Sequence, residues 1–237
     1  MLLLALSIAP GIAISLYIFL KDRFNREPHL NLIVCFLLGC LSVIPALIIQ
    51  IFTTKPVERL MGEGIFFTAV FAYLIVGFSE EWSKYIMLRS YAYPKKSFDE
   101  PFDGIVYSVM IGMGFATVEN ILYVQQHGLG TALVRMFLSV PAHATFAVLM
   151  GYFAGKAKFK PERRTFYLFT GIFWAAFFHG TYDFFLFLQG NSTVNRFLSD
   201  GLLFIGAVAS FIVAVWLSKK AIKEHHDLSK NMFHPDI

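Results

Sequence analysis

The chain has 237 residues, of which 57% are apolar and 27 are phenylalanine, and its formal net charge is +4 at pH 7. Soluble domains contain about 45–50% apolar residues, so this composition excludes an ordinary soluble enzyme and indicates a protein that crosses a membrane several times. No nucleic-acid partner is indicated by the positive charge, because the Lys and Arg residues lie in short stretches between apolar segments.

Seven apolar segments approach the length of about 20 residues that an α-helix needs to cross the hydrocarbon layer. In chain order they are residues 2–20, 30–53, 64–91, 104–125, 130–154, 165–189 and 198–218. The first has no basic stretch before it and no Ala-x-Ala-like site after it, so we expect it to be retained rather than removed as a signal peptide. Because every loop is short, the sequence predicts an all-α bundle of about seven transmembrane helices and a single integral-membrane domain over residues 1–237.

Basic residues are unequally divided between the two sides of this predicted bundle. Fifteen fall on one side, namely Lys21, Arg23, Arg26, Arg89, Lys95, Lys96, Lys156, Lys158, Lys160, Arg163, Arg164, Lys219, Lys220, Lys223 and Lys230. The other side carries Lys55, Arg59 and Arg196. The positive-inside rule therefore predicts an N-terminus outside the cell and a cytoplasmic C-terminus. The basic tail over residues 219–237 would then lie at the cytoplasmic surface, with His225 and His226 exposed.

The third segment contains the densest cluster of charges, Glu80-Glu81-Trp82-Ser83-Lys84, directly after a long apolar run. A charged side chain at the bilayer centre costs at least about 2.5 kcal/mol, so such a cluster needs a reason. Glu80 and Glu81 lie four and three residues before Lys84, so on a helix one ammonium can reach both carboxylates. The structural alternative is an ion-pair cluster at the cytoplasmic boundary, where long side chains reach water easily.

The three following segments each contain polar residues of types that catalyse reactions. They are Glu119 with Asn120, His143, and His179 with Asp183. A spacing of four residues lets Asp183 orient the imidazole of His179 and fix its tautomer. Pro141 predicts a bend in the helix beside His143. Taken alone, each of these motifs is also compatible with a hydrogen bond that only supports helix packing.

Depth in the bilayer connects these separate motifs. With a rise of about 1.5 Å per residue, Glu80, Glu119, His143 and His179 each lie about 16–18 Å from a marker at the end of their segment. In a hydrocarbon core about 30 Å thick, all four would come near the midplane, so we expect one polar site. Counted from Glu63 at the outer end, however, Glu80 lies about 25 Å deep, so the third segment must be tilted or the site must lie towards the inner leaflet.

The order of the motifs resembles that of the PrsW family of intramembrane proteases, distant relatives of the type II CAAX prenyl endopeptidases. The matching motifs are Glu-Glu-x-x-Lys from Glu80, Phe-x-x-x-Glu-Asn from Phe115, the isolated His143, and His-x-x-x-Asp from His179. The stretch Ala9-Pro10-Gly11-Ile12-Ala13 is also similar to the opening of Bacillus-type members, so the resemblance covers nearly the whole chain. In the CAAX relatives a His stands at the position of Glu119.

This resemblance implies a multi-pass protein of the bacterial plasma membrane that acts as a peptidase. Its implied reaction is the first, site-1 cut in a membrane-anchored anti-sigma factor, on the extracytoplasmic side, which starts an envelope-stress response. The partners would be that single-pass membrane substrate and the lipid bilayer. Carried over by position, the essential residues would be Glu80, Glu81, Lys84, Glu119, Asn120, His143, His179 and Asp183.

Two arrangements of these residues would hydrolyse a peptide bond. In the first, Glu119, His143 and His179 hold a Zn²⁺ ion, and Glu80 is the general base. In the second no metal is bound, Glu80 activates water with a histidine partner, and His179 or Asn120 stabilises the oxyanion. The sequence favours neither, because the dense His-Glu-x-x-His spacing of many zinc proteases is absent.

Two other functional classes use the same residue types. A transporter or proton channel also places Glu, Asp, His and Lys in membrane helices, although it usually contains paired repeats, which this sequence does not display. A catalytically silent scaffold for other membrane subunits is the remaining alternative. Cleavage assays on variants of the motif residues would separate a protease from both.

Overall fold

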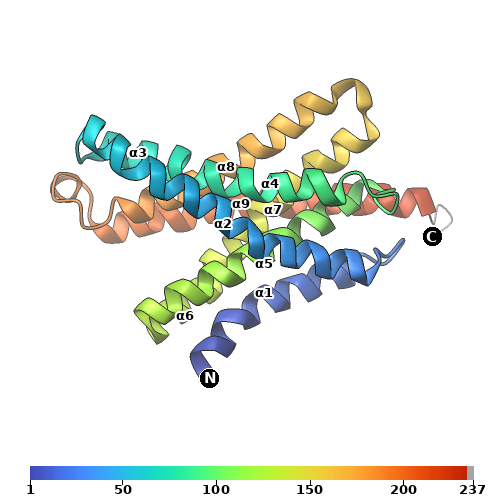
Figure 1. Ribbon diagram of the computed structural model, residues 1–237, viewed down its shortest axis with the longest axis horizontal. Helices are drawn as coiled ribbons and strands as arrows, with labels where there is room; N and C mark the ends of the chain where they lie inside the picture. The colour runs from blue at the N-terminus through green and yellow to red at the C-terminus, as the bar shows by residue number, and fades with distance from the viewer. Residues whose placement is uncertain (234–237) are drawn as a thin grey trace.

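The computed structural model describes residues 1–233, and every regular element within that range is a helix. In chain order the elements are α1 (Leu2–Lys21), α2 (His29–Met61), α3 (Ile65–Val70), the π-helix η1 (Phe71–Phe78), α4 (Ser79–Met87), the π-helix η2 (Leu88–Ala92), α5 (Pro101–His127), α6 (Leu129–Phe137), α7 (Ser139–Phe159), the 3₁₀-helix η3 (Pro161–Arg163), α8 (Arg164–Phe187), the 3₁₀-helix η4 (Val194–Arg196) and α9 (Asp200–Phe233). The predicted all-α membrane bundle is confirmed (Figure 1).

Within the described residues, six helical segments are long and apolar enough to cross a membrane by length and composition. The predicted segment 165–189 is not among them, although it folds as the 24-residue helix α8. Its tyrosine and threonine residues, together with His179 and Asp183, lower the mean hydropathy of this segment. α8 nevertheless belongs to the bundle, because it packs against α7, α9 and η1.

Helix α5 is the centre of the bundle. It is buried on all sides from Pro101 to Thr117 and packs against α1, α2 and α7 (Figure 1). Small residues permit this close packing: a Cβ at Gly151 of α7 would collide with the carbonyl oxygen of Gly104, and a Cβ at Gly114 would collide with that of Phe36 on α2.

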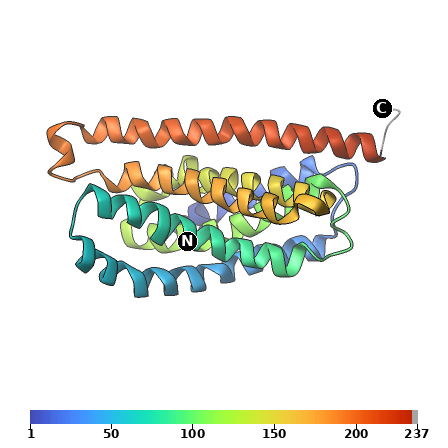
Figure 2. The same cartoon turned by 90° about the horizontal axis from the view of Figure 1, so that it is seen from above.

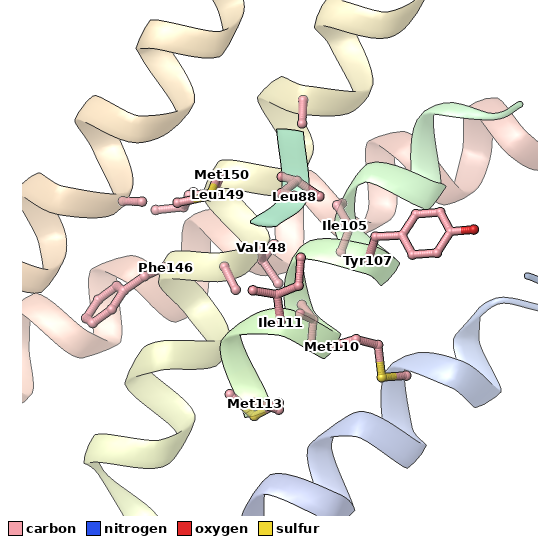
Figure 3. Packing of buried hydrophobic residues seen from close by; sticks show 14 of the residues in the cluster. Leu88, Ile105, Tyr107, Met110, Ile111, Met113, Phe146, Val148, Leu149 and Met150 are labelled. Atoms are coloured by element: carbon pink, nitrogen blue, oxygen red, sulfur yellow. The ribbon is translucent and has the colours of Figure 1, made fainter. Parts of the chain in front are cut away.

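Apolar side chains fill the space around α5. Figure 3 shows Ile105, Ile111 and Met113 of α5 beside Phe146 and Leu149 of α7, all of them buried. The outward faces of α1, α2 and α9 also carry large apolar side chains, which are exposed in the isolated chain. Such faces suit contact with lipid, since the hydrocarbon interior offers no hydrogen-bond partners.

The third predicted segment, 64–91, forms a continuous helical stretch over Ile65–Ala92. Two parts of it are π-helical, η1 immediately before α4 and η2 immediately after it. π-helical turns are rare and occur frequently at functional sites. Glu80 and Glu81 stand in the first turn of α4, so the wider turns of η1 set the direction in which these carboxylates point.

The fifth predicted segment, 130–154, is divided into α6 and α7 at Leu138. Pro141 is the third residue of α7, within the first turn, where a missing N–H removes no bond from the continuing helix. The helical stretch Leu129–Phe159 is therefore interrupted at Leu138, three residues before Pro141, close to where the sequence predicts a bend.

The last helix extends much further than the predicted segment 198–218. Figure 2 shows α9 running along one face of the bundle, and it continues to Phe233. Ala221, His225 and Ser229 follow at intervals of four residues and are all buried. The expectation that His225 is exposed is therefore wrong, because this stripe of the tail packs onto the helices beneath it. Residues 234–237 of the predicted tail lie outside the described residues.

We expect Gly151→Ala to lower the thermal unfolding midpoint of the purified protein, because the added methyl group forces α5 and α7 apart. Overpacking of this kind costs about 1–3 kcal/mol. Gly130→Ala is the matched control, since Gly130 is also helical but has open space where its Cβ would lie. Equal midpoints for the two variants in a detergent melting assay would contradict the close approach of α5 and α7.

Candidate active site

The predicted site residues come from four helices and gather in one region of the bundle. Helix α4 supplies Glu80, Glu81 and Lys84, α5 supplies Glu119 and Asn120, α7 supplies His143, and α8 supplies His179 and Asp183. Most of these side chains are buried, and Glu119 and Asp183 are partly buried. Contacts between residues up to 98 positions apart link the four helices.

Glu81 joins α4 to α8. Its Oε1 atom lies 2.6 Å from Lys84 Nζ and accepts a hydrogen bond from His179 Nδ1 at 2.8 Å. The same ammonium lies 3.8 Å from Glu80 Oε2, so one lysine reaches both carboxylates, as their spacing predicted. On the other side of the imidazole, His179 Nε2 lies 3.3 Å from Asp183 Oδ2, the partner predicted four residues later.

Lys84 also joins this group to His143. Its Nζ atom lies 3.2 Å from His143 Nδ1, and because an ammonium can only donate, Nδ1 must accept. The ring proton of a neutral His143 is then on Nε2, which donates to Glu119 Oε2 at 2.9 Å. The Lys84 ammonium on α4 is thus connected through the His143 imidazole on α7 to the Glu119 carboxylate on α5.

Arg135 of α6 completes the surroundings of Glu119, and its position was not predicted. Its Nη2 donates to Glu119 Oε2 at 2.6 Å, and its Nε donates to Asn120 Oδ1 at 3.0 Å. Asn120 in turn donates to the carbonyl oxygen of Ser7 on α1 at 2.9 Å. The Asn120 amide therefore holds α1, α5 and α6 together. An arginine within the apolar segment 130–154 was the sequence signal for this contact.

Glu80 has the loosest contacts of the carboxylates in the site. Its Oε1 accepts a hydrogen bond from Gln50 on α2 at 3.3 Å, whereas its Oε2 is buried without any hydrogen-bond donor. Lys84 Nζ and His179 Nε2 each lie 3.8 Å from this Oε2 atom. Gln50 escaped sequence-based prediction because an uncharged amide in an apolar segment gives a weak signal.

These groups line a cavity of about 450 Å³. Its polar lining includes Glu80, Glu119, His143, His179 and Asp183, together with Arg135 and Gln50. The lining continues along α5 to Gln126 and along α8 to Phe187, towards the loops that follow these helices. The cavity is therefore large enough for a segment of a ligand beside the polar cluster, and it extends towards one end of the bundle.

Negative charge exceeds fixed positive charge in this site. Glu80, Glu81, Glu119 and Asp183 are four carboxylates, whereas among residues 1–233 Lys84 and Arg135 are the only Lys or Arg side chains that form ion pairs with them. If all six groups are ionised, a charge of −2 remains in a largely buried cluster. Protons on the histidines, or a bound cation, are the means by which proteins compensate such a charge.

The donor set suits a metal ion once His143 exchanges its contact with Lys84 or Glu119 for the ion, because those contacts occupy both ring nitrogens. One atom each from Glu80, His143 and His179 lie within 4.8 Å of one another. Two histidines and a carboxylate are the ligands of several catalytic zinc sites, and the bond from His179 Nδ1 to Glu81 is the outer hydrogen bond that metal-bound histidines usually make. The carboxylate in this set is Glu80, whereas the sequence suggested Glu119, which here is paired with Arg135.

Comparison with known proteins identifies close relatives over most of the chain. The model of the family described as PrsW family intramembrane metalloprotease matches residues 27–218. The protease PrsW of Geobacillus kaustophilus is 40% identical over 185 residues, covering 78% of this chain and 79% of the relative. That of Bacillus subtilis is 40% identical over 190 residues, covering 80% and 84%. That of Shouchella clausii is 33% identical over 216 residues, covering 91% and 94%. No solved structure matches.

The contacts of the two adjacent glutamates predict different effects of Glu→Gln substitution on stability. Glu81→Gln weakens the buried contacts to Lys84 and His179, so we expect it to destabilise the protein by about 3–5 kcal/mol. Glu80→Gln retains the contact to Gln50 and leaves Lys84 paired with Glu81, so its thermal midpoint should stay close to that of the unsubstituted protein. Thermal melting of both variants in the same detergent is the measurement, and a larger loss for Glu80→Gln would contradict these contacts.

Proposed function

This chain belongs to the PrsW family of intramembrane proteases, and from that membership we propose that it makes the site-1 cut in a membrane-anchored anti-sigma factor. It is a multi-pass bacterial membrane protein and a peptidase by family. The observation that best supports hydrolysis at the proposed site is the convergence of Glu80, His143 and His179 in one cavity.

Glu80 is the carboxylate that we assign to the attacking water. A group that activates water needs an unoccupied acceptor atom that faces the substrate space. Glu80 Oε2 has no hydrogen-bond donor, and the residue lines the cavity. Glu81 also has an Oε2 without a donor, but it is less suited to this task, because it does not line the cavity and its Oε1 binds Lys84 and His179.

His179 is the side chain that we assign to proton delivery at the leaving amine. It lines the cavity between Glu80 and Asp183, so a proton taken from water by Glu80 has a short path to it. Glu81 and Asp183 hold the imidazole from its two sides. Their role is to position His179, since a general acid must lie within hydrogen-bond reach of the atom that it protonates.

A zinc ion would change these assignments: Glu80, His143 and His179 would hold it, and their coordinating atoms would then not be free to transfer protons. When bound there, it would supply Lewis-acid polarisation of the peptide carbonyl and would acidify water. With the ion bound, Glu80 would be a ligand beside the reacting water; without it, Glu80 accepts the water proton directly. The two alternatives differ in what metal removal does to the rate.

The direction of the cavity supports a cut near the extracytoplasmic surface. Its lining runs from the polar cluster towards Gln126 and Phe187, at the end of the bundle that the distribution of basic residues predicts to lie outside the cell. Val43, Leu47 and Phe115 give the cavity an apolar wall, which suits the apolar side chains of a segment that leaves the membrane.

We expect Glu80→Gln and His179→Ala each to slow cleavage by about 10²–10⁴-fold, the contribution typical of a general acid or base. The assay uses purified protein in detergent and a single-pass reporter that carries the extracytoplasmic part of an anti-sigma factor, with products identified by mass spectrometry. Glu63→Gln is the matched control, because Glu63 is exposed in the loop between α2 and α3. Unchanged rates in both site variants would overturn the assignment, whereas failure to cut this reporter while other membrane peptides are cut would overturn the substrate alone.

Metal removal separates the two alternatives for water activation. We expect a strong chelator to abolish cleavage and added Zn²⁺ to restore it, because the three donors converge and the matching family is described as metalloproteases. Elemental analysis should show zinc lost from His143→Ala, His179→Ala and Glu80→Gln but retained in Glu119→Gln. A fully active preparation without metal would contradict the zinc alternative and leave Glu80 as the direct acceptor of the water proton.

A further inference from the structure

A second buried cluster of carboxylates lies at the opposite end of α5 from the candidate active site. Asp22 follows α1, Glu27 lies in the loop before α2, Glu100 precedes α5, and Asp103 stands in the first turn of α5. None of the four is more than 3% exposed. Asp103 is 16 residues from Glu119 along α5, which corresponds to about 24 Å. The two clusters are therefore separate.

In at least three of these carboxylates, one oxygen accepts a hydrogen bond from the rest of the protein. Asp22 Oδ2 accepts the backbone N–H of Glu27 at 2.9 Å. Asp103 Oδ2 accepts the backbone N–H groups of Asp99 and Glu100 at 2.9 and 2.8 Å. Glu27 Oε2 accepts the hydroxyl of Tyr107, whose oxygen points away from the other labelled side chains in Figure 3. These bonds fix the orientation of the carboxylates.

The remaining oxygens are buried without a donor. They are Asp22 Oδ1, Glu27 Oε1, Glu100 Oε2 and Asp103 Oδ1. Helix α9 contributes a further oxygen atom, the hydroxyl of Ser229. This side chain is fully buried beside Glu100, and its hydroxyl makes no well-formed hydrogen bond. Within residues 1–233, no ion pair joins any of the four carboxylates to a Lys, Arg or His side chain. Buried acceptors without donors cost free energy, and protons or a bound cation can compensate that cost.

Three of the carboxylates are spaced to share one ion. One oxygen each from Asp22, Glu100 and Asp103 lie within 4.8 Å of one another. The donors are all oxygen atoms, which suit hard cations, in contrast to the two histidines of the candidate active site. We infer that Asp22, Glu100 and Asp103 bind a divalent cation of the hard class, Ca²⁺, Mg²⁺ or Mn²⁺, with the Ser229 hydroxyl beside it.

Such an ion would connect segments that are far apart in the sequence. Asp22 belongs to the connection between α1 and α2, Glu100 and Asp103 to the start of α5, and Ser229 to the end of α9. Ring contacts of His226 with Phe24 and Phe102 already bring the same three segments together. A cation that binds the folded chain better than the unfolded one stabilises this end of the bundle.

Protons are the competing means of neutralising the cluster. Burial raises the pKa of Asp22 to about 6 and that of Glu100 to about 8, so an ion-free cluster can hold protons near neutral pH. The two possibilities differ in a measurable way, because a bound ion has a fixed stoichiometry and saturates with its own concentration.

The test uses the purified full-length protein in detergent after chelator treatment, with Mn²⁺ as the probe in equilibrium dialysis and electron paramagnetic resonance. We expect saturable binding of Mn²⁺ at this site and competition by Ca²⁺ or Mg²⁺. Glu100→Gln and Asp22→Asn should each weaken binding by about 100-fold, since loss of even an outer partner costs about 10- to 100-fold in metal affinity. Asp99→Asn is the matched control, because Asp99 is exposed and offers its backbone N–H rather than its side chain to Asp103.

Glu80→Gln separates this site from the active site, and it should bind Mn²⁺ with unchanged affinity at the oxygen-ligand site. Ser229→Ala is a milder variant in case loss of a carboxylate prevents folding, and it should weaken binding measurably. Absence of saturable binding to the unsubstituted protein would overturn the inference. So would equal affinity in the Glu100→Gln, Asp22→Asn and Asp99→Asn variants. None of these readouts depends on peptide cleavage, so the result is independent of the proposed function.

Discussion

The ammonium group of Lys84 is the contact on which the polar interior of this bundle depends. It lies 2.6 Å from Glu81 Oε1 and 3.2 Å from His143 Nδ1, so one positive charge connects α4 with α7 and, through Glu81, with α8. A buried carboxylate pair without a cation would be costly in an apolar bundle. Lys84 also determines which nitrogen of a neutral His143 carries the proton, and hence that this histidine donates to Glu119.

Helix α5 carries polar clusters at both ends and an apolar layer between them. Asp103 belongs to one cluster and Glu119 to the other, while residues such as Ile105 and Ile111 are packed among apolar side chains (Figure 3). Because α5 contacts α1, α2 and α7, a change in the position of either end is resisted by the same packed core. The two clusters can therefore differ in ligand chemistry while they share one rigid support.

The sequence predicted the helices well because apolar runs of membrane length leave few alternatives. Proline chemistry predicted an irregularity near His143, and the structure has a break three residues before Pro141. It also predicted the pairs that lie within one helix, such as His179 with Asp183, from their spacing. Contacts between helices were not predictable in this way. The pairing of Glu119 with Arg135 depends on how α5 meets α6, and the burial of His225 depends on how the end of α9 packs. The π-helical turns of η1 have no recognisable local signal in a run of apolar residues.

The break at Leu138 has a consequence for the spacing of residues along the chain. Arg135 and His143 contact the same oxygen atom, Glu119 Oε2, from opposite sides of the break. In one straight helix, residues eight positions apart would be separated by about 12 Å along the axis. Both side chains nevertheless reach the same oxygen atom, and one added or deleted residue at the break would rotate the following helix by about 100°. Insertion or deletion of one residue between Arg135 and His143 would therefore turn one of the two side chains away from Glu119.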